Sequence, residues 1–249
     1  MVQKGVEKKV EKFSLIRQIR ENFPLIFRQQ VMIDSTKVDF KKTEKELYFP
    51  KKIEVINVPE MAYLTVSGQG APAGAAFQEA ISSLYPVAYA ISMAYKREDM
   101  DIPHFYRFVM PPLEGLWTSK TAPIANEPLR KEELIWKIMI RMPNFVTEEL
   151  VEWAKKEVSL KKKRDFSQIK YEKIKDGLCI QAMHKGSFEY EAETFALMET
   201  FAATEGYELI HKEYHHREIY LSDFRKTSSE KLKTVLRQYA QIKTKEKEK

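Results

Sequence analysis

The chain has 249 residues, of which 43% are hydrophobic and 31% charged, and a formal net charge of +6. This length is enough for one large or two small domains with a sizeable core. The single cysteine, Cys179, excludes an internal disulfide and a multi-cysteine metal site, and it suits a reducing cytoplasm. No apolar run approaches the ~18 residues of a membrane span. The charged N-terminus lacks the apolar core of a signal peptide, so we expect a cytoplasmic protein.

Basic residues gather in the first dozen positions, at 161–164 and in the tail after 242. No basic run is interleaved with aromatic side chains, as in a groove for single-stranded nucleic acid, and no helix-turn-helix or zinc-finger pattern occurs. We interpret these stretches as solvated ends and a linker. Neither nucleic-acid binding nor membrane association is expected.

The first 37 residues are interpreted as a basic N-terminal extension, helical in part because Val6, Val10 and Phe13 form one stripe. A lead-in follows, and alternating apolar residues then predict a long strand over about 56–66, which ends at 68–70. The next apolar stripe predicts a helix over about 77–95, kinked or restarted at Pro86.

Two strands are predicted next, at 105–110 and 135–142, with residues 111–117 as a turn between them. In the second strand, Trp136 shares a face with Ile138, Ile140 and Met142. A surface helix follows over 147–160, and the acids in its first turn agree with the helix dipole.

The same order of elements then recurs. A strand at 171–186, a helix to about residue 205, a strand at 216–222 and a closing strand near 233–237 repeat the earlier series. The sequence therefore predicts an α+β fold of two duplicated β-α-β-β units related by a pseudo-twofold axis, with a ligand cleft between the halves. Their expected bounds are about 52–145 for repeat 1 and 168–240 for repeat 2, within a domain at 38–240 that a charged tail at 241–249 follows.

The strand at 216–222 carries the candidate site. If Ile219 and Leu221 face a packed side, Glu218 and Tyr220 share the other face. A carboxylate beside a phenol suits the floor of a pocket for a flat apolar ligand with one polar handle. The alternative is a solvated edge strand. A facing turn that carries Trp117 from the first repeat favours the pocket.

Several stretches together resemble the GyrI-like family of small-molecule-binding proteins. In order, they are 58–61, 77–80, 84–85, 111–117, 139–147, 184–186, 215–223 and 231–234. The resemblance spans about 38–240 and points to a stand-alone subgroup, similar to proteins reported to hydrolyse cyclopropane-bearing DNA-alkylating natural products. It implies a duplicated fold with a cleft between the repeats and an acidic residue, here Glu218, at the base. The chain departs from the family pattern at Phe224, Thr118 and Lys185, which affects ligand size and identity.

The chemistry follows from the same residues. Glu218 can act as a general base toward water or as a counter-charge for a cation, and Tyr220 is its candidate partner. The candidate ligand-binding residues are Trp117, Glu114, Tyr89, Phe108 and Trp136, although each aromatic could be ordinary core and Glu114 could be a turn residue. His184, His215 and His216 lack the spacing of metal ligands, so we expect neither metal nor cofactor.

Two functions therefore stay open. One is a hydrolase that detoxifies a strained, planar electrophile by adding water, with Glu218 as the base. The other is a module that binds, senses or sequesters lipophilic or cationic drugs without turnover. The expected partner is a small molecule, and both a monomer and a homodimer are compatible with the sequence.

Overall fold

The computed structural model describes residues 37–97, 99–121 and 130–243. The chain divides into two compact units, residues 1–38 with 106–108, and residues 39–105 with 109–249. Apart from Lys37, the predicted basic extension lies outside the described residues. In the smaller unit, Val38 forms a parallel bridge with Phe108, and its N–H donates to the Arg107 carbonyl at 2.8 Å.

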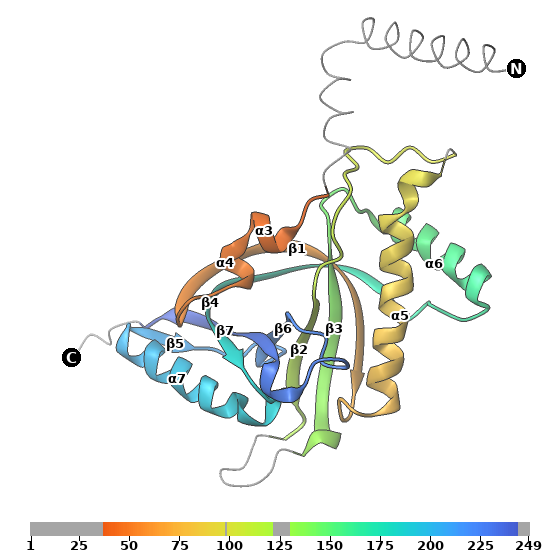
Figure 1. Cartoon of the computed structure of the whole chain (residues 1–249). Coiled ribbons are helices and arrows are strands. Elements are labelled where there is room, and N and C mark those ends of the chain that lie inside the picture. The colour runs from red at the N-terminus through yellow and green to blue at the C-terminus, as the bar shows by residue number, and fades with distance from the viewer. Residues whose placement is uncertain (1–36, 98, 122–129, 244–249) are drawn as a thin grey trace, which may run out of the picture. The chain divides into compact units, whose positions relative to one another are not determined.

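The larger unit is built on one antiparallel sheet (Figure 1). The order β4-β1-β3-β2-β6-β7 is closed into a ring by pairing between β4 and β7. The short β5 extends the far end of β7. The strands are β1 (Glu54–Gln69), β2 (Leu113–Ser119), β3 (Leu134–Met142), β4 (Lys170–Lys185), β5 (Tyr207–Leu209), β6 (His216–Tyr220) and β7 (Lys233–Ile242).

Five α-helices belong to the same unit in the described part of the chain: α3 (Phe40–Thr43), α4 (Lys45–Tyr48), α5 (Ala75–Ser92), α6 (Glu148–Lys162) and α7 (Glu191–Thr204). Thr147 caps α6 by accepting a hydrogen bond from the Leu150 N–H at 3.3 Å. Four 3₁₀ turns complete the set: η1 (Ala94–Lys96), η2 (Lys131–Glu133), η3 (Phe188–Tyr190) and η4 (Ser229–Lys231). Within the described residues, no helix is both long and apolar enough to cross a membrane.

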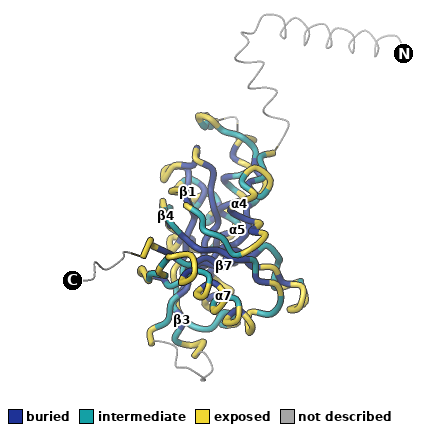
Figure 2. Tube along the Cα trace, turned by 90° about the vertical axis from the view of Figure 1, so that its left-hand side faces the viewer, coloured by how far each residue is buried: buried dark blue, intermediate teal, exposed yellow. Residues whose placement is uncertain are grey.

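Alternation along the strands gives the ring two faces. The outer face is largely apolar and is covered by α5 and α7, which lie on different stretches of the ring (Figure 1). Beneath α7, for example, Ile180 and Leu236 pack against Met198 and Ala202. The strands are largely buried, whereas exposed residues concentrate at turns and on the outer sides of helices (Figure 2).

The inner face holds a buried ionic network. Arg217 donates to Glu114 Oε2 at 2.6 Å and to Asp176 Oδ1 at 2.8 Å. Arg237 donates to Gln181 Oε1 at 2.8 Å and lies 3.8 Å from Asp176. Each of these five side chains is almost inaccessible to solvent. Mutual pairing is what makes such burial tolerable, because an isolated buried charge is very costly.

One predicted strand is wrong. Residues 105–110 form no strand, and the strand begins at Leu113, within the stretch predicted as a turn. Pro111 and Pro112 have no N–H and cannot donate to a ladder, so regular pairing starts after them. On one side β6 therefore pairs with β2. In the comparison of the two predicted repeats, the strand that corresponds to 216–222 is 113–119 and not 105–110. The predicted charged tail also begins too early, since β7 extends to Ile242.

Candidate functional site

The candidate site lies at the seam where β2 meets β6, which joins the two halves of the chain. The antiparallel register places Leu113 opposite Tyr220, Gly115 opposite Glu218 and Trp117 opposite His216. All six therefore share the outer face. As predicted, Glu218 and Tyr220 point to one side of β6 and Ile219 to the other, and both sides are buried.

Glu218 is almost wholly enclosed, with 8% of its surface exposed. One of its oxygens lies 3.0 Å from His216 Nε2. Tyr220 hydrogen-bonds to the same carboxyl, and the Trp117 Nε1–H donates to the Tyr220 hydroxyl at 2.9 Å. Burial and the nearby negative charge of Glu218 raise the pKa of Tyr220 well above its ordinary value. Tyr220 is thus a neutral phenol that passes a hydrogen bond from Trp117 toward Glu218.

Gly115 makes room for this arrangement. A Cβ atom at this position would lie 2.6 Å from Trp117 Nε1 and 3.0 Å from the Tyr220 hydroxyl. Those are the two atoms of the Trp117–Tyr220 hydrogen bond. Any side chain at position 115 would therefore push the indole and phenol apart.

Aromatic side chains surround the polar centre. The Phe77 ring lies 5.5 Å from Trp117, and Phe195 of α7 lies 4.8 Å from His216. Phe188 and Phe224 pack edge-on against Tyr220, with ring centroids at 6.0 and 5.3 Å. Phe224, one of the positions at which the sequence departs from the expected family pattern, is thus one of the rings packed on Tyr220.

A second carboxyl, Glu191, belongs to the same neighbourhood. It is the first residue of α7 and is 8% exposed. Burial, followed by repulsion from Glu218, raises its pKa to about 10. Glu191 could not be predicted as a site residue, because nothing in the sequence separates it from the exposed Glu189 and Glu193 beside it.

Glu114, predicted for the same cleft as Glu218, lies elsewhere. It points to the inner face and pairs with Arg217. Treating residues 111–117 as a turn left its direction open, whereas the strand places it on the opposite side from Gly115 and Trp117.

Three aromatic candidates have other surroundings. Trp136 lies on the outer face over Gly68, 5.2 Å from Phe77, and its Nε1–H donates to the Gly70 carbonyl at 3.2 Å. Tyr89 is 53% exposed on α5. Phe108 is buried and belongs to the smaller unit. Of the predicted ligand-binding residues, the structure brings Trp117 alone into hydrogen-bonded contact with the Glu218–Tyr220 pair.

The histidines have different environments. His184 bonds to the Thr194 hydroxyl and to the Ser187 carbonyl, which fixes the start of α7. His215 stacks on His211 at 4.5 Å. His216 is a direct partner of Glu218, with its Nε2 atom 3.0 Å from one carboxyl oxygen. In the described part of the chain, no three His, Cys, Asp or Glu side chains are grouped as ligands for one metal ion.

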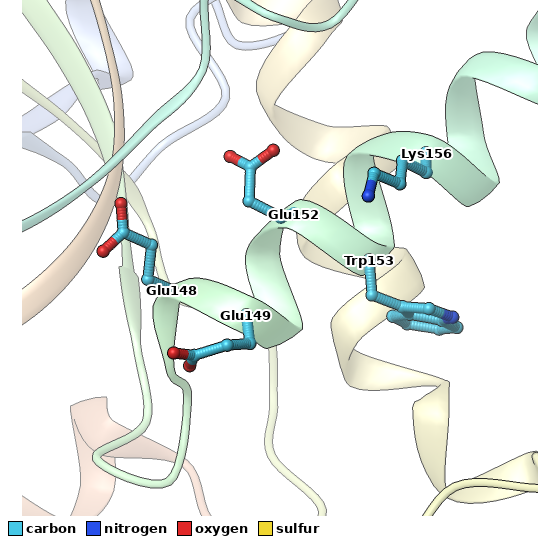
Figure 3. A pocket seen from close by; sticks show the side chains of 5 residues that line it. All are labelled: Glu148, Glu149, Glu152, Trp153 and Lys156. Carbon is cyan, nitrogen blue, oxygen red and sulfur yellow. The ribbon is translucent and has the colours of Figure 1, made fainter.

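A surface hollow of about 450 Å³ lies elsewhere, along α6 (Figure 3). Its lining comes from a single helix and consists of Glu148, Glu149, Glu152, Trp153 and Lys156. Figure 3 shows these side chains spread along the helix rather than converging on one point. The hollow therefore lacks the convergent polar groups of a small-molecule site.

The chain is similar to several proteins of known structure. Three solved structures from Listeria innocua are similar over the whole of their own chains. Two are hydrolases, with 42% and 41% identity, TM-scores of 0.75 and 0.76, and matches to 82% and 83% of this chain. The third is an uncharacterized conserved protein with 43% identity and a TM-score of 0.76 over 82% of this chain. Among curated proteins, none matches the chain.

The profile of the GyrI-like small molecule binding domain matches residues 51–237. This range contains β1 to β6 and the first half of β7, which continues to Ile242. It therefore includes the β2–β6 seam with its buried carboxyl. The chain belongs to the GyrI-like small molecule binding domain family.

Proposed function

We propose that the β2–β6 seam binds planar hydrophobic molecules with one polar handle, and that the protein hydrolyses cyclopropane-bearing genotoxic compounds by adding water. The observation that carries the proposal is the buried Glu218 carboxyl, which is hydrogen-bonded to His216 and Tyr220. Aromatic rings pack against both of these partners. Aromatic walls suit a flat ligand, and a few fixed polar groups give it an orientation. The hydrolase names of two similar proteins support turnover.

The reaction is balanced for a cyclopropane fused to a dienone. Glu218 takes a proton from water as the water oxygen bonds to the unsubstituted ring carbon. The ring carbon–carbon bond breaks, and its electron pair moves into the dienone, which becomes a phenolate. That oxygen takes up a proton, and Glu218 releases the proton that it accepted from water, which restores the carboxylate. The product is the phenol with one water added, and no oxidant or reductant is required.

The local hydrogen bonds suit these roles. His216 Nε2 holds one Glu218 oxygen at 3.0 Å, which fixes the carboxyl orientation. Tyr220 stays protonated because its pKa is raised, so it can stabilise negative charge only as a donor. Trp117 holds the phenol in place from the other strand. The chain of hydrogen bonds from Trp117 through Tyr220 to Glu218 therefore helps to hold the carboxyl in one orientation.

A second function is the non-catalytic binding of cationic or lipophilic drugs. The described residues contain no Lys or Arg ion-paired with Glu218, whose neighbouring basic side chain is His216. An enclosed carboxylate next to aromatic faces is a suitable partner for an organic cation. This function needs no water near Glu218, and that difference separates it from hydrolysis.

The test is incubation of the protein with a cyclopropane-dienone alkylator, followed by mass spectrometry. Hydrolysis predicts accumulation of a product heavier by one water. Glu218→Gln should reduce turnover by roughly two orders of magnitude or more while still binding the compound. Glu193→Gln on the exposed side of α7 is the matched control and should be as active as the native protein. Unchanged turnover in Glu218→Gln would refute the base assignment. Saturable binding of aromatic cations without any water adduct would favour the second function.

We also propose that the two halves arose by duplication about a pseudo-twofold axis. The support is the pairing pattern. Exchanging β1 with β4, β2 with β6 and β3 with β7 leaves every pairing in the ring unchanged. The axis would then pass through the β1–β4 and β2–β6 pairs, so that both halves contribute to the site.

A further inference from the structure

Glu191 has features that its position on a helix does not explain. An acid in the first turn of a helix is normally exposed and accepts hydrogen bonds from free N–H groups. Glu191 instead is 8% exposed, and among the described residues none forms a hydrogen bond with its buried Oε1. Unsatisfied buried polar atoms are rare in folded proteins and call for a specific cause.

The surroundings of Glu191 connect it to the seam. In its ionised form, Glu191 would be repelled by the negative charge of Glu218. The same ionised form would also raise the pKa of Tyr220. Both of these groups lie on the outer face of β6. The His184–Thr194 and His184–Ser187 contacts hold the start of α7 on β4, and Phe195 of α7 lies 4.8 Å from His216 of β6. Glu191 is therefore a neighbour of the proposed reaction centre, contributed by a different element.

Two carboxyls in one apolar enclosure do not ionise together readily, because burial and mutual repulsion both oppose the second charge. Glu218 has two partners that stabilise its negative charge, His216 and Tyr220. Glu191 has no such partner at Oε1. The proton therefore resides on Glu191, whose pKa is raised to about 10, and the O–H group is an available donor.

We propose that Glu191 is a second functional carboxyl of this site, and that it donates a hydrogen bond to a carbonyl oxygen of the bound ligand. The inference rests on the proposed binding function and sharpens its ligand class to neutral planar compounds with a ring-conjugated carbonyl. A cation offers no acceptor for this donor. A carbonyl oxygen satisfies the orphaned Glu191 oxygen while the ring occupies the aromatic surround.

The same group completes the proton balance of hydrolysis. As the cyclopropane carbon–carbon bond breaks, Glu191 gives its proton to the oxygen that would become phenolate. Glu218 meanwhile takes a proton from the attacking water. Transfer of that proton from Glu218 to Glu191 restores both residues, so one acid and one base act without net consumption.

Xanthone and xanthene provide a direct test, because these tricyclic molecules differ in one carbonyl. Binding to the full chain is measured by tryptophan fluorescence and calorimetry. We expect the native protein to prefer xanthone by roughly three- to tenfold, the contribution of one hydrogen bond. Glu191→Gln keeps a donor and should retain most of this preference. Glu191→Leu should bind both compounds about equally, and Glu193→Gln should behave like the native protein.

A second measurement covers the case in which Glu191→Leu does not fold. The infrared band of a protonated carboxylic acid should shift when xanthone binds and stay in place with xanthene, and it should be missing from Glu191→Gln. Equal affinity of the native protein for the two probes, or no band shift with bound xanthone, overturns the role of Glu191 and leaves the binding function standing. Failure of both probes to bind overturns the proposed function together with the inference.

Discussion

Trp117 and Tyr220 are 103 positions apart in the chain, and their side chains are joined by a buried hydrogen bond of 2.9 Å. Trp117 belongs to β2 in the first half and Tyr220 to β6 in the second. The bond therefore crosses the seam between the halves. It also fixes the phenol that contacts Glu218, so the stability of the seam and the geometry of the candidate site depend on the same pair.

This dependence predicts a measurable coupling. Trp117→Phe and Tyr220→Phe each remove one partner and keep an aromatic ring. In a double-mutant cycle monitored by urea denaturation, we expect a coupling energy of about 1 kcal/mol, because either single change leaves the other polar group buried and unpaired. Trp153→Phe on α6 provides a control outside the seam. Additive effects within experimental error would show that the bond does not stabilise the fold.

The inner network predicts a larger effect at Arg217. Arg217→Met keeps a long side chain and removes the charge that pairs with Glu114 and Asp176. Two buried carboxyls then lack their main partner, and we expect a loss of about 3–5 kcal/mol in the free energy of unfolding. Chemical denaturation at neutral pH measures this loss.

Arg225→Met is the matched control for that experiment. Arg225 pairs with Asp223 at 2.9 Å, but its side chain is 46% exposed. Exposed pairs contribute little, so we expect a change below about 0.5 kcal/mol. Similar losses in the two variants would contradict a stabilising role specific to the inner network.

Much of the fold could be predicted because its long elements carry strong patterns. Alternation in β1, β3 and β4, and the apolar stripe of α5, fixed these elements to within a few residues. The failures occurred where local signals were weak or competed. Residues 105–110 are rich in aromatic and other apolar β-formers, whereas the strand that begins at Leu113 follows two prolines. The four-residue helices α3 and α4 and the three-residue β5 are too short to show a period.

The candidate site was predictable in part for related reasons. Glu218 and Tyr220 are two residues apart on one strand, so sequence spacing alone places them on one face. The side of the sheet to which Glu114 points depends on which residues belong to β2. Because residues 111–117 were predicted as a turn, the sequence could not tell which side that is. Glu191 was out of reach, since its burial depends on how α7 packs on the ring of strands rather than on its neighbours in sequence.

The raised pKa of Glu191 predicts how stability changes with pH. This pKa rises from an ordinary 4.5 to about 10 on folding, so the folded protein holds a proton that the unfolded chain releases. The contribution is complete below about pH 4.5 and is lost as pH rises toward about 10. Stability should therefore decline with pH over this window, by at most ~1.4 kcal/mol per pH unit from this group.

Urea denaturation at about pH 5, 7 and 9 measures this slope. Glu191→Gln removes the titrating group and should flatten the curve, so the variant gains stability over the native protein as pH rises. Glu193→Gln, in the same helical turn but exposed, should leave the slope as it is. A native slope that persists in Glu191→Gln would show that another group is responsible.

Gly115 provides the most local test of the seam. In Gly115→Ala the new methyl group would lie 2.6 Å from Trp117 Nε1 and 3.0 Å from the Tyr220 hydroxyl. Neither side chain is free to move, because Trp117 packs on Phe77 and Tyr220 on Phe188 and Phe224. We expect a loss of about 1–3 kcal/mol from overpacking, and weaker ligand binding because the Tyr220 donor is displaced. Ser119→Ala at the end of the same strand should change neither quantity, and native-like affinity in Gly115→Ala would separate the Trp117–Tyr220 bond from ligand binding.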